Sequence, residues 1–242
     1  MRLLFGILLI CSCFSLLFAE QKEFTIGVEE QEYMPQYKMQ NGEFMGVASD
    51  ILNAFAKSKG YKVKFIQLPV TRLLNAMTSK EVDFKYPDNP YWAADFRKGK
   101  TIYYSDPVVD YIDGVLVTPE NLNKGVAHIK SLGSIAGFTP FEYLDKIKSG
   151  AIKVYSFPNI EGMLIRGINA QIDGVYVQTS VGKYYLNSIK KSGALVFDPS
   201  LPHSKSSYKL SSANHPEIIA EFNEFLKNRE LMKKIKSKYG LD

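Results

Sequence analysis

Short β-compatible runs alternate with amphipathic helical runs over most of this sequence. In the first ninety residues the strand-like segments are 24–28, 62–67 and 82–86. The helices between them run from Ser49 or Asp50 to Gly60 and around Leu73, Leu74 and Met77. Strands that alternate with helices in this way predict a βαβαβ unit with a parallel sheet.

The same alternation continues in the second half of the chain. The strand-like segments there are 111–118, 134–136, 152–157, 174–178 and 194–197, and the helical segments are 140–148, 160–169 and 180–191. A further strand at 208–211 precedes a helical region from Pro216 with Ile218, Phe222 and Leu226 on one face. The pattern predicts a second α/β unit followed by a terminal helical region.

An apolar stretch from Leu3 to Phe18 follows Arg2 and ends at Ala19. This is the layout of a secretory signal peptide, and the stretch is shorter than the roughly 20 residues that a bilayer-spanning helix needs. We therefore expect residues 1–19 to be removed and the mature chain to be exported; an uncleaved N-terminal anchor is the alternative. Both cysteines lie in this stretch, so the mature chain has no thiol for a disulfide or a zinc site.

Charge and motifs argue against several classes of function. The net charge is +5, and the excess of Lys and Arg is not gathered into a basic block, so we expect no nucleic-acid partner. The sequence contains no phosphate-binding loop, dinucleotide fingerprint, nucleophile elbow or zinc-protease motif. The three histidines do not have the spacing of metal ligands. We expect no cofactor, no metal site and no catalytic residue.

Aromatic and charged residues are concentrated in one segment toward the end of the first half. They are Tyr86, Asp88, Tyr91, Trp92, Asp95, Arg97, Tyr103, Tyr104, Asp110 and Tyr111. Such a set suits a small polar ligand, because rings exclude water while each charge can pair with one ligand group. The alternative is a surface loop whose tyrosines pack onto the sheet.

Several short patterns follow one another along the chain. They are Gly42-Glu43-Phe44-Met45-Gly46 before Asp50-Ile51-Leu52, Arg72-Leu73-Leu74-Asn75-Ala76-Met77 before Lys80-Glu81-Val82-Asp83, Tyr104-Ser105-Asp106-Pro107-Val108, Glu142-Tyr143-Leu144, Gln171-Ile172-Asp173-Gly174-Val175, and Ile235 to Gly240. In order and spacing, the mature chain resembles the family 3 extracellular solute-binding proteins, the periplasmic receptors of polar amino-acid ABC transporters and their relatives.

The resemblance implies an α/β fold with two lobes, the type II periplasmic binding protein fold. Each lobe would be a mostly parallel sheet flanked by helices, and two hinge strands would join the lobes. Lobe 1 would comprise residues 20–110 and 211–242, and lobe 2 residues 118–204, with hinge segments 111–117 and 205–210. The resemblance further implies that a ligand is trapped between the lobes by hinge closure.

Amino-acid receptors of this family typically hold the ligand carboxylate with an Arg in a Thr-x-x-Arg stretch and the ligand ammonium with an Asp at the end of a lobe 2 strand. Here the corresponding stretch has no Thr, Arg97 is displaced by one position, and the expected Asp is Gln178. These departures argue against an ordinary α-amino acid as the ligand. Arg72 is the next candidate for an anion clamp.

The expected ligand-binding residues are Tyr33, Arg72, Tyr86, Asp88, Trp92, Arg97, Thr139 and Gln178. Of these, Tyr33 and Trp92 are expected to stack on the ligand, and Thr139 to offer its hydroxyl and backbone N–H. We expect a monomer that captures a small polar solute bearing a carboxylate and passes it to an ABC permease or reports it to a membrane sensor. Two alternatives are a cyclohexadienyl dehydratase-like enzyme using Asp88, Asp95 or Glu161 as an acid, and a sensory protein that binds a partner.

Overall fold

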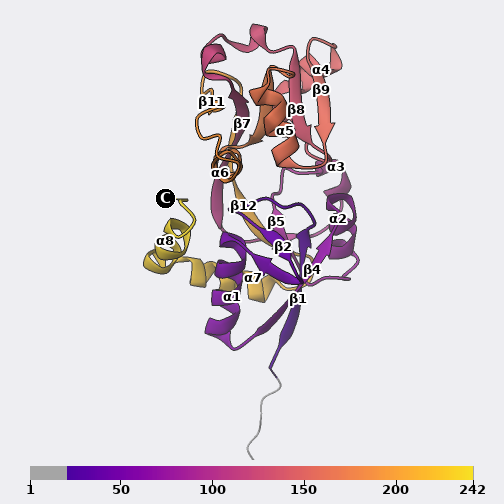
Figure 1. Cartoon of the computed structure of the whole chain (residues 1–242). Coiled ribbons are helices and arrows are strands. Elements are labelled where there is room, and N and C mark those ends of the chain that lie inside the picture. The colour runs from indigo at the N-terminus through magenta and orange to yellow at the C-terminus, as the bar shows by residue number, and fades with distance from the viewer. Residues whose placement is uncertain (1–20, 242) are drawn as a thin grey trace, which may run out of the picture.

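The computed structural model describes residues 21–241, and the predicted signal peptide at 1–19 lies outside the described residues. Two α/β lobes lie one above the other in Figure 1 and share a path of paired strands in the order β4-β1-β5-β12-β7-β10-β8-β9. Pairing is parallel for β4-β1-β5 in lobe 1 and for β10-β8-β9 in lobe 2. The expected α/β fold with two lobes is confirmed.

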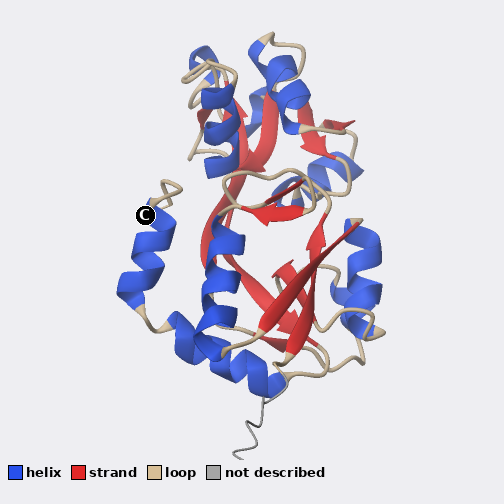
Figure 2. Ribbon diagram, turned by 60° about the horizontal axis from the view of Figure 1, so that its bottom comes forward, coloured by secondary structure: helices blue, strands red, loops and turns tan. Residues whose placement is uncertain are grey.

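Lobe 1 holds the N-terminal and C-terminal parts of the chain. Its strands are β1 (Glu23–Glu29), β2 (Lys38–Gln40), β3 (Glu43–Met45), β4 (Lys62–Leu68), β5 (Phe84–Asp88) and β6 (Tyr103–Tyr104). Its helices are α1 (Val47–Lys59), α2 (Val70–Thr78), α3 (Ala94–Arg97), α7 (Pro216–Leu226) and α8 (Arg229–Ser237). Figure 2 shows the helices on both sides of the lobe 1 strands.

Lobe 2 is built from the middle of the chain. Its strands are β8 (Ser131–Ile135), β9 (Lys153–Phe157), β10 (Gly174–Gln178) and β11 (Val196–Phe197). Its α-helices are α4 (Leu144–Lys148), α5 (Ile160–Ile168) and α6 (Thr179–Ser188), and its 3₁₀ turns are η1 (Pro119–Asn121), η2 (Val126–His128) and η3 (Phe141–Tyr143).

Two long strands, β7 (Val109–Val117) and β12 (Ser204–Ser212), run between the lobes. They pair antiparallel with each other; β12 also pairs with β5 and β6 of lobe 1, and β7 pairs with β10 and β11 of lobe 2. We call them the crossing strands. Because β12 has strand neighbours on both sides, main-chain pairing extends it beyond the predicted 208–211, although its serines and lysines have little β propensity.

Apolar residues of α1 show how a lobe 1 helix is held to the sheet. Ile51, Leu52 and Phe55 are each at most 5% exposed, and the Phe55 ring meets Phe222 of α7 edge-on at 5.0 Å. Burial of a side chain of this size contributes roughly 1.5–3 kcal/mol. The packing joins the two sequence-distant parts of lobe 1.

The prediction that α1 begins at Ser49 or Asp50 is wrong, because the helix begins at Val47. Gly46 precedes it with φ of 106°, and a Cβ there would lie 2.6 Å from the Gln36 carbonyl oxygen. The Ser49 hydroxyl donates to the Phe44 carbonyl at 2.6 Å and caps no helix. A glycine turn, and not a side-chain cap, starts this helix.

The terminal helical region is divided into α7 and α8. The Asn228 side chain accepts from the Leu231 N–H at 3.1 Å and so caps a new helix. No helix within residues 21–241 has both the length and the apolar character needed to cross a bilayer.

Candidate ligand-binding site

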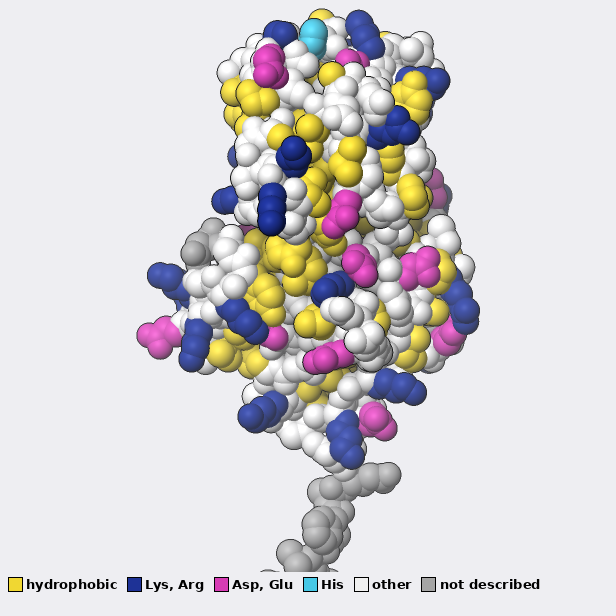
Figure 3. Space-filling view, viewed as in Figure 1, with side chains coloured by type: hydrophobic (Ala, Val, Ile, Leu, Met, Phe, Trp, Pro, Cys, Tyr) yellow, Lys and Arg dark blue, Asp and Glu magenta, His cyan; other side chains and the backbone are white. Residues whose placement is uncertain are grey.

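The lobes contact each other through the loop after β1 on one side and the ends of β8 and β10 on the other. We refer to this junction, together with the segment after β5 and the crossing strands, as the interlobe cleft. The Gln178 N–H donates to the Tyr33 hydroxyl at 3.3 Å, and Gln36 Nε2 donates to the Ser180 hydroxyl at 3.4 Å. The Tyr33 ring meets Phe138 edge-on at 5.4 Å. Hydrophobic side chains gather where the lobes meet (Figure 3). In this conformation the lobes are in contact.

An ion-pair network lies on the lobe 1 side of the cleft. The Asp88 carboxylate is fully buried and accepts from Arg97 Nη2 at 2.5 Å, Arg97 Nη1 at 3.2 Å and Lys85 Nζ at 3.1 Å. The Ser211 hydroxyl and the Asn89 N–H also donate to Asp88, at 2.5 Å and 2.8 Å. Burial alone would raise the pKa of Asp88, but Lys85 and Arg97 outweigh it and hold that pKa below its ordinary value. The network therefore keeps Asp88 ionised.

The Arg97 guanidinium is almost fully used by these internal contacts. Besides the two bonds to Asp88, its Nε donates to the Trp92 carbonyl at 2.6 Å and its Nη1 to the Tyr104 hydroxyl at 2.5 Å. Four of its five N–H groups thus have protein partners.

Glu29, at the end of β1, is a second buried acid beside this network. Its carboxylate accepts from the Tyr37 hydroxyl at 2.5 Å. Burial raises the pKa of Glu29, while the Lys85 charge and the Tyr37 hydrogen bond oppose the rise. Lys85 and Arg97 are two cations and Glu29 and Asp88 are two acids, so the formal charges on the lobe 1 side of the cleft are balanced.

Aromatic rings form a wall across the cleft. Tyr111 of β7 and Tyr208 of β12 stack with centroids 4.4 Å apart, and the Trp92 ring lies 6.3 Å from the first and 6.0 Å from the second. Lys85 Nζ lies 5.5 Å from the Trp92 centroid, a cation–π distance. One ring of this aromatic wall, Trp92, is thus already in contact with a cation of the protein, Lys85.

Asp113 of β7 lies on the lobe 2 side of the cleft, opposite Gln178 in the β7–β10 ladder and opposite Ser204 in the β7–β12 ladder. Its Oδ1 atom is shielded from solvent and has no hydrogen-bond partner among the described residues. Burial, and then the Glu142 charge, raise the pKa of Asp113 from 3.8 to about 7. No described Lys, Arg or His forms an ion pair with it.

Most of the predicted ligand residues border the cleft: Tyr33, Tyr86, Asp88, Trp92, Arg97 and Gln178. The Gln178 side chain is used locally, because its Oε1 accepts from the Ser180 hydroxyl at 2.7 Å and from the Val181 N–H at 2.8 Å. It thus caps α6. Contact of these residues with a ligand stays a prediction.

Arg72 and Thr139 lie in different surroundings. The Arg72 side chain is 60% exposed and pairs at 2.8 Å with Glu81, beyond the carboxyl end of α2, so it is not brought together with the cleft residues. Thr139 is exposed and directly follows Phe138, whose ring contacts Tyr33. Thr139 therefore lies at the cleft rim.

Glu29, Lys85 and Asp113 were not among the predicted site residues. Each is a charged residue inside a strand whose neighbours are mostly buried. A charge that interrupts a buried strand is the sequence signal that could have identified them.

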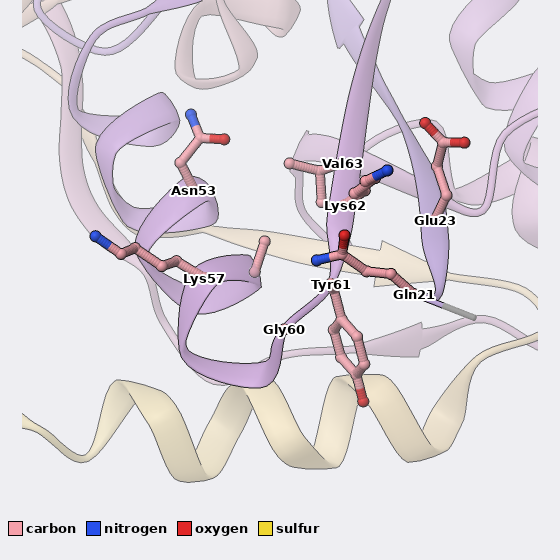
Figure 4. A pocket seen from close by; sticks show the side chains of 9 residues that line it. Gln21, Glu23, Asn53, Lys57, Gly60, Tyr61, Lys62 and Val63 are labelled. Carbon is pink, nitrogen blue, oxygen red and sulfur yellow. The ribbon is translucent and has the colours of Figure 1, made fainter. Parts of the chain in front are cut away.

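Two surface hollows lie away from the cleft. The first, of about 440 Å³, is lined by Asn53 and Lys57 of α1, by Tyr61 just before β4, and by Gln21 and Glu23 (Figure 4). The second, of about 390 Å³, lies between α8 and the segment at Pro107 and Val108. Within residues 21–241, no group of three His, Cys, Asp or Glu side chains could hold a metal ion.

Comparison with known proteins places this architecture in a family. The model for bacterial extracellular solute-binding proteins, family 3, matches residues 24–242, whereas no curated protein matches. The arginine-, lysine-, histidine-binding protein ArtJ from Geobacillus stearothermophilus superposes with a TM-score of 0.70 at 22% identity, over 90% of this chain and 95% of that one.

Two further solved structures share the fold at lower identity. The substrate-binding protein of an amino acid ABC transporter has a TM-score of 0.70 at 19% identity, over 91% of this chain and 100% of that one. A histidine kinase sensor domain with similarity to periplasmic binding proteins has a TM-score of 0.70 at 17% identity, over 91% and 96% of the two chains. Since the family model spans nearly all of the described residues, this protein belongs to family 3 of the bacterial extracellular solute-binding proteins.

Proposed function

We propose that this protein captures a small polar solute between its two lobes and does not transform it. This proposal is supported by the polar and aromatic side chains that both lobes and both crossing strands contribute to one interlobe cleft. Tyr33 contacts Gln178 and Phe138 across it. A concave, mostly aromatic site with a few placed polar groups suits a small ligand.

We infer that residues 20–110 and 211–242 move as lobe 1 and residues 118–204 as lobe 2. The hinge segments would be 111–117 and 205–210. The pairing of the crossing strands supports this division, because β12 is bonded to β5 on one side and to β7 on the other. Rotation about two adjacent strands would open the cleft without breaking either lobe.

We further propose that the protein is a monomer, exported to the periplasm by the signal peptide at residues 1–19. There it passes its solute to an ABC permease or reports it to a membrane sensor. Both roles occur among the structures that share the fold, one from an amino acid ABC transporter and one from a histidine kinase sensor.

The predicted carboxylate on the solute would need a cationic partner. Arg97 can bind it only by exchanging Asp88 for the solute, because four of its five N–H groups are already used. Thr139, which is exposed at the cleft rim, offers a hydroxyl to such a group. Dicarboxylates therefore belong in any binding screen.

A dehydratase-like enzyme on this fold has less support. Of the acids expected for it, Asp88 is held by Lys85 and Arg97, while Asp95 and Glu161 are exposed. Conversion of prephenate by the purified protein would contradict our proposal.

The direct test is a thermal-shift screen of the mature chain with amino acids, amines, dicarboxylates and keto acids. A ligand at 100 times its Kd stabilises by about 2.7 kcal/mol, and a chain of this size shifts by roughly 2–4 °C per kcal/mol. Tyr33→Ala should abolish most of the shift, because it removes contacts to both Phe138 and Gln178. Tyr155→Ala, at an exposed tyrosine of β9, should keep it.

Small-angle scattering gives an independent result. A stabilising compound should leave the radius of gyration at the value of lobes in contact, while the free protein samples a larger one. A screen without any stabilising compound, or a compound that binds with equal affinity to Tyr33→Ala, would contradict capture in the cleft.

A further inference from the structure

Several buried polar atoms at the cleft have no hydrogen-bond partner among the described residues. Within residues 21–241, three buried side-chain atoms have no hydrogen-bond partner: Gln36 Oε1, the Tyr86 hydroxyl and Asp113 Oδ1. Gln36 contacts Ser180 across the lobes, Tyr86 packs on Tyr208, and Asp113 lies on a crossing strand. Gln36 Oε1, and Asp113 Oδ1 when the carboxyl is ionised, can only accept, so the missing group is a hydrogen-bond donor.

The charges around the cleft point to the same chemistry. On the lobe 1 side, Lys85 and Arg97 balance Glu29 and Asp88. On the lobe 2 side, Asp113 faces Glu142, which accepts from the Tyr176 hydroxyl at 3.0 Å. Neither acid is ion-paired with a described residue, so a negative charge on Asp113 has no cation of the protein to compensate it. A buried carboxylate without a partner is costly, and a cationic ligand would remove that cost.

Asp113 also lies beside the position where the family resemblance places an ammonium-binding acid. That position is Gln178, which is directly opposite Asp113 in the β7–β10 ladder. Directly opposed residues of an antiparallel pair share one face of the sheet. The carboxylate is thus displaced by one strand, while the neutral Gln178 caps α6.

Aromatic residues surround Asp113 on several elements. Burial raises the pKa of Tyr33, Tyr176, Tyr208 and Tyr111, and the Asp113 charge raises each further, which places all four hydroxyls within its electrostatic reach. Aromatic faces attract organic cations, and Lys85 over Trp92 shows this contact in the same wall.

We propose that Asp113 is the anchor for a cationic group of the solute, and that the cleft selects small organic ammonium ions that need no α-carboxylate. This inference rests on the proposed solute capture. The Asp113 carboxylate accepts the ammonium N–H groups or pairs with a quaternary ammonium, while Tyr111, Tyr208 and Trp92 present their ring faces. Arg97 stays bound to Asp88 and takes no part in recognition.

Binding of such a cation depends on pH. The groups that face Asp113 are Glu142 from η3, Tyr33 from the loop after β1, Tyr176 from β10, Tyr208 from β12 and Tyr111 from its own strand. A cation binds the ionised carboxylate, so below about pH 7 the free protein must release a proton on binding. Affinity should therefore fall as pH falls from 8 to 6, approaching tenfold per pH unit.

The experiment is isothermal titration calorimetry of the mature chain with choline, spermidine and agmatine, and with L-arginine, L-glutamate and succinate as comparators. We expect at least one of the three amines to bind the wild type, and Asp113→Asn to bind it at least tenfold more weakly. Asp110→Asn is the matched control, because Asp110 is an exposed acid on the same strand. It should leave the affinity unchanged.

The outcomes separate this inference from solute capture. Binding of succinate or L-glutamate alone, with affinity unchanged in Asp113→Asn, would overturn the inference and leave solute capture intact. No binding by any of the six compounds would overturn both. If Asp113→Asn does not fold, a carboxyl ¹³C titration of the wild type decides: an Asp113 that titrates near 4 is not the unpaired acid that the inference requires.

Discussion

Replacing Asp113 by Asn should stabilise the free protein at alkaline pH. The pKa of this acid is raised from 3.8 to about 7 by burial and by Glu142. Below pH 3.8 both the folded and the unfolded chain hold the proton, and Asp113 costs nothing. As pH rises from 4 to 7, only the unfolded chain readily loses the proton, so the folded state becomes progressively less favourable. Above about pH 7 the cost is constant.

The magnitude follows from the size of that rise. At about 1.4 kcal/mol per pKa unit, the full rise corresponds to about 4 kcal/mol at pH 8. Asp113 Oδ1 is shielded, but the residue as a whole is only half-buried, so solvent screening reduces this value and we expect about 2 kcal/mol. The melting temperature of Asp113→Asn should then exceed that of the wild type by about 4–8 °C at pH 8.

Differential scanning calorimetry between pH 5 and pH 8 measures this difference, with Asp110→Asn as the reference for removal of one negative charge. The Asp113→Asn advantage should grow across this range, and the Asp110→Asn difference should stay small. A constant difference from pH 5 to pH 8, or a destabilised Asp113→Asn at pH 8, would refute the argument that the carboxylate is buried without a partner.

Three other substitutions test the surrounding structure. Arg97→Ala leaves Lys85 as the one cation paired with Asp88 among the described residues and should lower the free energy of unfolding by about 3–5 kcal/mol in urea titrations, with a smaller loss for Arg97→Lys. A loss below 1 kcal/mol would disprove the tight network. Arg72→Ala should change the free energy of unfolding by at most about 0.5 kcal/mol, because the pair of Arg72 with Glu81 is exposed. Calorimetry should show an unchanged solute affinity for this variant, and a tenfold weaker affinity would show that Arg72 reaches the cleft. Phe138→Ala removes the ring that meets Tyr33 across the lobes and should increase the radius of gyration of the solute-bound protein by scattering; an unchanged radius would show that this contact does not hold the lobes together.

The order of elements could be predicted from the sequence because hydrophobic periodicity repeats in every unit. Strand β10 has the predicted bounds 174–178, and α5 differs by one residue at its end. The start of α1 could not be predicted, because it depends on the close approach of Gly46 to the Gln36 carbonyl, a tertiary contact. For the same reason the length of β12 was underestimated, since its pairing partners are distant in sequence.

The candidate site was predictable only in part. The aromatic residues near Trp92 could be identified from composition, but which charges satisfy one another depends on geometry. Arg97 and Asp88 are nine residues apart in sequence, and the sequence does not show that they bind each other in the fold. Nor does it show that the Gln178 side chain, at a strand end, caps the helix that follows. Local sequence does not distinguish these uses of a polar side chain.

The position of Asp113 on a crossing strand bears on how binding and closure would be coupled. A ligand shifts a conformational equilibrium only through interactions that differ between the two states. In the proposed hinge motion, β7 belongs to the axis about which the lobes rotate, so a solute held by Asp113 can keep that contact in the open and the closed protein. Such a contact adds affinity to both states equally and does not by itself favour closure. Among the described residues, the contacts of Tyr33 with Phe138 and Gln178 and that of Gln36 with Ser180 exist only when the lobes meet. The anchor and the closing contacts are thus on different elements, which lets affinity for a cation and the extent of closure vary independently.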